Sequence, residues 1–163
     1  MLVLGIDPGT AITGFGVVEQ NEEPRLVDAG AILTKAGTPL PERLLAIHQQ
    51  LSSVIDAFQP DAVAVEELFF SKNARTAMSV GHARGVVLLA AAQAGLPIFN
   101  YKPAEVKVAV TGYGNAAKPQ VQEMVRLLLH LDEIPKPDDV ADAIAVALCH
   151  LQSAYLRQLM AEE

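Results

Sequence analysis

The chain has 163 residues and a formal net charge of −7, with 51% hydrophobic and 19% charged side chains. This length and composition predict one globular domain, residues 1–163, with a core large enough to be stable alone. The single cysteine, Cys149, excludes an intramolecular disulfide and a thiolate zinc site. We find no signal-peptide pattern and no apolar stretch approaching the roughly 17 to 25 residues of a membrane helix. We therefore expect a cytoplasmic protein with no membrane partner.

Three short strands are predicted at the start of the chain. They cover Leu2 to Ile6, Thr13 to Glu19 and Leu26 to Thr34, and short turns separate them. Each run is rich in apolar residues and is bounded by turn residues, which is typical of strands. Because the connections are short, we expect the three strands to form an antiparallel meander.

Helices and strands alternate in the rest of the chain. Apolar residues at helical spacing predict a helix from Pro41 to Phe58, followed by a buried strand at Ala62 to Val65. A long alanine-rich helix is predicted from Asn73 to Ala94, and a strand from Leu96 to Tyr101. Three further helices are predicted at about 104–110, 119–130 and 138–156. This order predicts an α/β fold, a mixed five-stranded sheet flanked by helices.

Acidic residues follow two of the predicted strands. Asp7 ends the first strand within Gly-Ile-Asp-Pro-Gly-Thr, at the carboxyl edge of the sheet where α/β sites lie. A turn residue that only caps its own loop is the alternative for this aspartate. Glu66 and Glu67 directly follow the strand Ala62 to Val65. A strand buried on both faces shows no alternation, so the pattern does not choose between the two glutamates.

The helix predicted from residue 138 carries three more acids. Asp138 or Asp139 suits the helix start, where the dipole favours a negative charge. Asp142 lies three residues after Asp139 and therefore on the same face of the helix. The rest of this helix is so apolar that it must be buried. Capping explains the first two acids, but Asp142 requires a partner.

A cluster of such carboxylates repels itself unless a hard divalent cation neutralises it. Oxygen ligands favour Mg²⁺ or Mn²⁺ over zinc, and the four histidines show no metal-ligand spacing. Carboxylate clusters holding two ions about 4 Å apart recur in phosphodiester cleavage. The acids therefore lead to the hypothesis of a hydrolytic nuclease.

The charge distribution favours contact with a phosphate backbone. Residues 71–126 hold seven basic and two acidic side chains, a net charge of +5 against −12 for the remainder. A positive surface beside the acids would attract nucleic acid despite the negative total. Phe69 and Phe70 belong to a predicted loop at the start of this segment, where an aromatic ring can stack on an unpaired base. Packing into the core is the alternative for either ring.

Five segments resemble successive motifs of the RuvC family of Holliday junction resolvases: GIDPGTAITGFGVV, VAVEELFFSKNA, VGHARGVVLLAA, PAEVKVAVTGYGNAAKPQVQ and DDVADAIAVALCH. The resemblance implies an RNase H-like fold. It also implies a homodimeric endonuclease that nicks two strands of like polarity in four-way junction DNA, in recombination and DNA repair. Mg²⁺-dependent cleavage is implied as well, with two ions per site, Mn²⁺ as a substitute, and 5′-phosphate and 3′-hydroxyl products. The RuvA and RuvB branch-migration proteins are the implied partners.

Site residues follow from the same resemblance, motif by motif. The implied metal-binding catalytic acids are Asp7, Glu66, Asp139 and Asp142. Some relatives carry histidine at the position of Asp139. The expected DNA-binding residues are Phe69, Lys72, Arg75, Lys107 and Lys118. The long helix from Asn73 corresponds to the dimer interface, where Gly81 and Gly85 would permit close approach of two helices.

Three other functions compete with this interpretation. A YqgF-type processor of ribosomal RNA precursors shares a similar start, but the Phe-Phe-Ser-Lys-Asn loop and the two-glycine turn before Lys118 favour the resolvase. An actin-like or sugar-kinase phosphate binder would need a second, related domain, for which 163 residues are too few. A DNA-architecture protein would gain nothing from carboxylates placed near phosphates.

Overall fold

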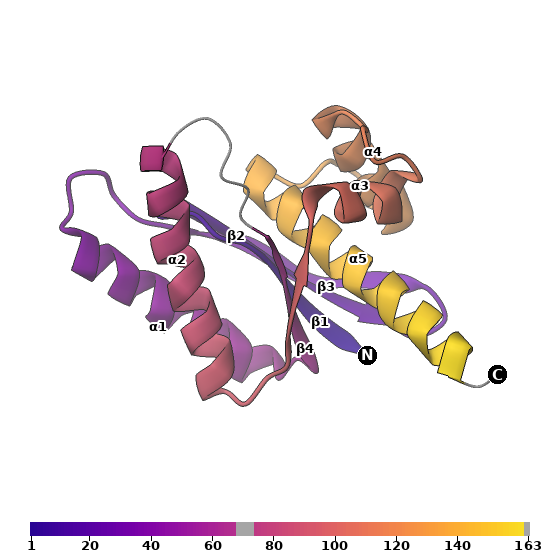
Figure 1. Cartoon of the computed structure of the whole chain (residues 1–163), viewed down its shortest axis with the longest axis horizontal. Helices are drawn as coiled ribbons and strands as arrows, with labels where there is room; N and C mark the ends of the chain where they lie inside the picture. Colours follow the sequence, from indigo (N-terminus) through magenta and orange to yellow (C-terminus); the bar gives the residue numbers. More distant parts are fainter. Residues whose placement is uncertain (68–73, 162–163) are drawn as a thin grey trace.

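A five-stranded sheet forms the centre of the protein (Figure 1). The structure is a computed structural model and describes residues 1–67 and 74–161. The strands lie in the order β3-β2-β1-β4-β5. β1 pairs antiparallel with β2, as β2 does with β3, whereas β1–β4 and β4–β5 are parallel. The mixed five-stranded sheet is thus confirmed, with strands at Leu2–Asp7, Ile12–Gln20, Pro24–Leu33, Ala62–Glu66 and Ile98–Tyr101.

Helices cover both faces of this sheet (Figure 1). One face carries α1 and α2, and the other carries α3, α4 and α5. Their bounds are Leu40–Phe58, Ala74–Gln93, Pro103–Thr111, Lys118–Leu128 and Asp138–Ala161. The type and order of the predicted elements are confirmed, and α5 runs five residues further than the sequence predicted. No helix in the described part of the chain is long and apolar enough to cross a membrane.

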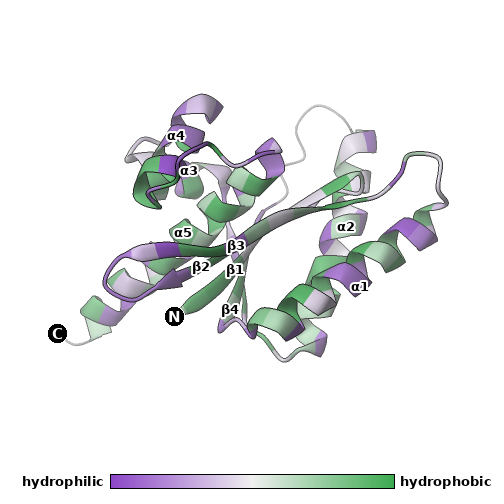
Figure 2. Ribbon diagram, turned by 180° about the vertical axis from the view of Figure 1, so that it is seen from behind, coloured by the Kyte–Doolittle hydropathy of each residue, from purple (hydrophilic) through white to green (hydrophobic). Residues whose placement is uncertain are grey.

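The central strands are buried on both faces, so each contributes to two cores. In β1, Val3 packs on the side of α5, whereas Leu4 and Ile6 pack on the side of α1 and α2. Figure 2 shows the hydrophobic colouring of β1 between the two helical layers. Burying an aliphatic side chain of this size contributes about 1.5 to 3 kcal/mol to folding. This double burial explains why β1 and β4 read as continuous apolar runs.

Three glycines of β1 and β2 allow α5 to lie directly on the sheet. A Cβ atom at Gly5 would overlap the backbone oxygen of Ala143, and one at Gly16 would overlap the side chain of Ile144. A Cβ atom at Gly14 would overlap the carbonyl oxygen of Asp139. The start of α5 therefore reaches the end of β1 because these positions lack side chains.

The loop that follows β1 is bound to α2. The Thr10 hydroxyl donates a hydrogen bond of 2.6 Å to the carbonyl oxygen of Ser79, and the Ser79 hydroxyl donates to Thr10 Oγ1 at 2.9 Å. The Thr34 hydroxyl donates to the carbonyl oxygen of Thr10. The backbone just after Asp7 is thus fixed between α2 and the end of β3.

Candidate active site

Four acidic residues converge where β1, β4 and α5 meet. Asp7 is the last residue of β1, and Glu66 is the last residue of the neighbouring parallel strand β4. Residues two apart in a strand face the same side of the sheet. Gly5 contacts α5 and Ala64 packs in the core beside this helix, so Asp7 and Glu66 face α5 as well. Asp139 and Asp142 lie in the first two turns of α5. The sheet edge and the helix start therefore bring together acids that are up to 135 residues apart.

The raised pKa values of three acids in the cluster show that too little positive charge lies near their carboxylates. Burial, together with the charges of Asp142, Asp139 and Glu66, raises the pKa of Asp7 to about 7. Burial and the charge of Asp142 also raise the pKa of Glu66. Burial is the main reason that the pKa of Asp142 is raised as well. A positive charge placed among these acids would lower all three pKa values.

Lys118, the first residue of α4, supplies part of that charge. Its ammonium group donates a hydrogen bond of 3.0 Å to Oδ2 of Asp142 and lies 3.5 Å from Oδ2 of Asp138. Burial lowers the pKa of Lys118, but the two carboxylates outweigh burial and raise it overall. The lysine side chain is half exposed, so the ion pair is open to solvent and to exchange for another partner.

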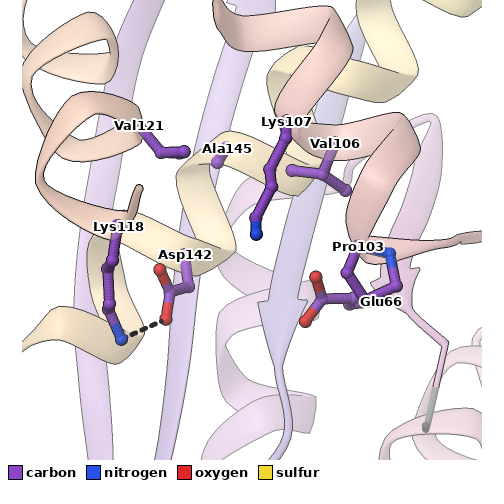
Figure 3. A pocket seen from close by; sticks show the side chains of 8 residues that line it. All are labelled: Glu66, Pro103, Val106, Lys107, Lys118, Val121, Asp142 and Ala145. Carbon is purple, nitrogen blue, oxygen red and sulfur yellow. Dashed lines mark hydrogen bonds and ion pairs between the residues drawn. The ribbon is translucent and has the colours of Figure 1, made fainter. Parts of the chain in front are cut away.

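A pocket of about 230 Å³ separates Glu66 from the Asp142–Lys118 pair (Figure 3). Lys107, from α3, points into the space between the two acids, and its charge lowers the pKa of Glu66. The remaining lining is mostly apolar: Pro103, Val106, Val121 and Ala145. The pocket thus combines two carboxylates and two lysines on an apolar floor, a setting that suits the binding of an anionic phosphate beside a cation.

The donor set fits an oxygen-liganded divalent cation. The acids offer only carboxylate oxygens, which Mg²⁺ and Mn²⁺ prefer. In this structure the cation beside Asp142 is the ammonium group of Lys118. Within residues 1–67 and 74–161, no group of three or more His, Cys, Asp or Glu side chains is arranged to hold a metal ion.

The basic surface is narrower than the charge sum of residues 71–126 indicates. Lys107 and Lys118 lie at the pocket, and Arg75 lies in the first turn of α2. Arg126 is bound to Glu123 at 2.6 Å, and Arg84 donates to the side chain of Asn100. Arg84 and Arg126 are therefore engaged with neighbouring side chains of the protein itself, as Lys118 is with Asp138 and Asp142. Two expected DNA-binding residues lie outside the described residues, namely Phe69 and Lys72.

Sequence reasoning missed two contributions to the site. The sequence pattern accounts for Asp138 only as a possible helix cap, whereas in the structure Asp138 shares Lys118 with Asp142. The importance of Gly5, Gly14 and Gly16 was also missed, although glycines inside strands are a known sign of close backbone approach. The Gly-Phe-Gly sequence in β2 was the available signal.

A mixed sheet of this topology, with acids ending β1 and β4 and opening α5, defines a nuclease of the RNase H-like class. The profile of crossover junction endodeoxyribonuclease RuvC matches residues 3–150. The chain therefore belongs to the RuvC family, whose members are metal-dependent nucleases.

Named relatives agree with this membership over nearly the full length. The chain is 59% identical to crossover junction endodeoxyribonuclease RuvC of Chloroflexus aggregans over 155 residues, 94% of each chain. It is 57% identical to the protein of the same name from Desulfitobacterium hafniense over 161 residues, 98% of each chain. Among solved structures, Thermus thermophilus RuvC in complex with Holliday junction substrate superposes with a TM-score of 0.91 at 44% identity, covering 96% of both chains. The expected RNase H-like fold and RuvC resemblance are confirmed.

Proposed function

We propose that this protein resolves four-way DNA junctions in recombination and repair by nicking two strands of like polarity. The observation that carries the proposal is the convergence of Asp7, Glu66, Asp139 and Asp142 beside the basic pocket of Lys107 and Lys118. Family membership gives the substrate, because a relative with a TM-score of 0.91 is described in complex with a Holliday junction. The acids supply the chemistry and the lysines bind the phosphate backbone.

The four acids are the groups that would hold the metal ions. These acids would hold two Mg²⁺ ions per site, or Mn²⁺ in their place, which when bound would supply charge neutralisation and water activation for a hydrolysis that leaves 5′-phosphate and 3′-hydroxyl ends. Asp7 and Glu66 approach from the sheet, and Asp142 approaches from the helix. Asp139 acts on Asp7 through its charge and completes the set.

Lys107 and Lys118 have separate tasks in this proposal. Lys107 already points into the pocket beside Glu66, so it binds a phosphate without changing partners (Figure 3). Lys118 is paired with Asp142 and half exposed, so its ammonium group could exchange this carboxylate for the DNA backbone if Asp142 bound a metal ion instead. Phe69, Lys72 and Arg75 would add further contacts to the DNA, with Phe69 stacking on an unpaired base.

A homodimer would place two such sites on one junction, because a two-fold axis matches two symmetric strands. The helix α2 has a suitable surface. Met78 and Leu89 are 64% and 52% exposed, and His82 and Gly85 lie between them on the same exposed face at spacings of four, three and four residues. A Cβ atom at Gly85 would meet nothing within 4 Å, so a second helix has room to approach.

Family membership is also the basis for the remaining partners. We propose that the dimer acts in the cytoplasm with the RuvA and RuvB branch-migration proteins. RuvA and RuvB would bring a junction to the nuclease, and the nuclease would select the strands to cut.

Cleavage of a synthetic four-way junction with Mg²⁺ tests the proposal. Wild-type protein is expected to produce paired nicks at symmetric positions, and Asp7→Asn is expected to bind the junction without cutting it. Asp56→Asn, an equivalent change on exposed α1, serves as the matched control and should cut normally. Equal binding of duplex and junction by the wild type, without cleavage, would show that the proposal is wrong.

The role of Phe69 needs a test of its own. We expect Phe69→Ala to impair junction cleavage while circular dichroism shows an intact fold. Loss of the folded state would instead show that this ring belongs to the core.

A further inference from the structure

A buried polar pair joins the last strand of the sheet to α5. The Tyr101 hydroxyl and Nδ1 of His150 are hydrogen-bonded at 2.7 Å, and the two residues are 7% and 1% exposed. Polar groups placed in an apolar core cost free energy unless they bind each other, and an apolar pair would fill the space without that demand. Bonded polar pairs in a core select one arrangement of the elements that carry them.

The two elements joined by this pair are those that bring the acids together. Tyr101 is opposite Glu66 in the parallel pairing of β4 and β5, and its carbonyl oxygen accepts a 2.7 Å hydrogen bond from the backbone N–H of Glu67. His150 follows Asp142 on α5 by eight residues, about 12 Å along the helix axis. The hydrogen bond therefore connects the backbone next to Glu66 with the helix that holds Asp142.

The surroundings keep this pair neutral and fixed in orientation. The Phe99 ring lies 4.3 Å from the His150 ring, and the guanidinium group of Arg157 lies 5.4 Å from the Phe99 ring centre. Burial, assisted by the charge of Arg157, lowers the pKa of His150 to about 4. The imidazole is consequently uncharged at neutral pH, and its ring is held between Phe99 and Tyr101.

We propose that the Tyr101–His150 hydrogen bond positions the two halves of the metal site, by fixing the end of β4 relative to the start of α5. The inference rests on the proposed function, since it takes Glu66 and Asp142 as metal ligands. Neither Tyr101 nor His150 contacts the pocket, so both are positioning residues. A displacement of about 1 Å in a catalytic group can reduce a rate on the order of 100-fold, so a contact this far from the pocket can still control cleavage.

Three variants separate positioning from packing. Tyr101→Phe removes one oxygen and keeps the ring, and His150→Leu removes the hydrogen-bonding nitrogen. His150→Asn keeps a polar atom near the position of Nδ1 and is the conservative variant. Ile47→Val serves as the control, because it removes a buried methyl group from the core on the opposite face of the sheet.

The measurements are Mn²⁺ affinity by calorimetry, urea unfolding, and kcat and KM for junction cleavage. We expect Tyr101→Phe and His150→Leu to weaken Mn²⁺ binding about tenfold, as losses around metal ligands do, and to lower kcat with KM unchanged. His150→Asn should recover most of the affinity. Ile47→Val should lose stability and bind Mn²⁺ as the wild type does.

Each outcome decides between two statements. If Tyr101→Phe and His150→Asn both fold and bind Mn²⁺ like the wild type while His150→Leu only loses stability, the pair is a packing contact and the inference is wrong. If Asp7→Asn binds Mn²⁺ as tightly as the wild type, the proposed site itself is wrong. If Asp7→Asn binds Mn²⁺ more weakly than the wild type but Tyr101→Phe binds it equally well, the metal site stands and only the positioning role is wrong.

Discussion

Gly14 and the carbonyl oxygen of Asp139 lie so close together that position 14 has no room for a Cβ atom. Gly14 is paired with Asp7 across β1 and β2, so the contact falls beside the carboxylate that ends β1. The approach of α5 to the sheet is thus set at the same place where the acids meet. A single methyl group at position 14 would move the helix start and the acids it carries.

We therefore expect Gly14→Ala to impair both the fold and the site. Overpacking of this kind costs about 1 to 3 kcal/mol of unfolding free energy, which urea denaturation measures. Junction cleavage with Mg²⁺ should fall more than tenfold. Ile47→Val, with a comparable loss of about 0.5 to 1.5 kcal/mol, should keep normal cleavage. Normal cleavage by Gly14→Ala would show that the position of α5 is not critical.

The pKa of Asp7 predicts how the stability of the metal-free protein depends on pH. Because the folded protein holds the Asp7 proton up to a pH of about 7 and the unfolded chain releases it near 3.8, stability falls as the pH rises through this interval. Asp7→Asn cannot ionise and should be more stable than the wild type at pH 8, by at most about 4 kcal/mol. At pH 4 the difference should vanish. Urea unfolding in EDTA at both pH values measures it, with Asp56→Asn as control.

Equal or greater stability of the wild type at pH 8 would contradict this expectation. It would mean that Lys118 and solvent already compensate the charge of Asp7. Excess Mg²⁺ should reverse the order at pH 8, because ligand binding to the folded state stabilises only the protein that retains the carboxylate.

Lys118→Gln separates metal binding from DNA cleavage. The Lys118 ammonium group lies 3.0 Å from Asp142, so it competes with a metal ion for this carboxylate and repels the ion. The glutamine variant removes both effects. A charge at this range is worth about 1 kcal/mol in water, so Mn²⁺ should bind about fivefold more tightly in calorimetry. Cleavage should nevertheless fall, because the variant lacks the ammonium group that we propose binds the DNA backbone. Lys35→Gln, an exposed change in a turn, should alter neither property.

Weaker Mn²⁺ binding by Lys118→Gln would reverse this interpretation. The lysine would then be needed to hold Asp138 and Asp142 in place.

A fourth prediction concerns the exposed face of α2. If α2 forms the proposed dimer interface, Leu89→Glu should give a monomer in light-scattering measurements and abolish paired nicking, because a buried charge would be left without a partner. The thermal stability of the monomer should be unchanged, since Leu89 is 52% exposed. Leu156→Glu is the matched control near the far end of α5, at 53% exposure. A dimeric Leu89→Glu protein would place the interface elsewhere.

The predicted order of helices and strands held because the periodicity of apolar residues is a local property. The choice between Glu66 and Glu67 was not available from the residues alone, since the burial of β4 on both faces removes the alternation that would show which side chain faces α5. In the structure Glu66 lines the pocket, and the backbone N–H of Glu67 binds Tyr101.

Contacts between distant residues explain what sequence reasoning did not find. Tyr101 and His150 are 49 residues apart, and nothing near either residue predicts their hydrogen bond. The ion pair between Lys118 and Asp138 likewise depends on how α4 packs against the start of α5. The role of Gly14 depends on which helix covers β2, and the strand pattern carries no such information.

Asp7 and Glu66 lie on central strands that are hydrogen-bonded to a neighbouring strand on both sides. Asp139 and Asp142 lie in the first turns of α5, and helix ends fray more readily than central strands. The strand half of the proposed metal site is therefore more rigid than the helix half. We therefore expect any adjustment on ion binding to be confined to the first turns of α5, ahead of the His150 contact. We expect Mg²⁺ to slow amide hydrogen exchange chiefly at residues 138–145. The exchange rates of β1 and β4 should be nearly the same with and without the ion.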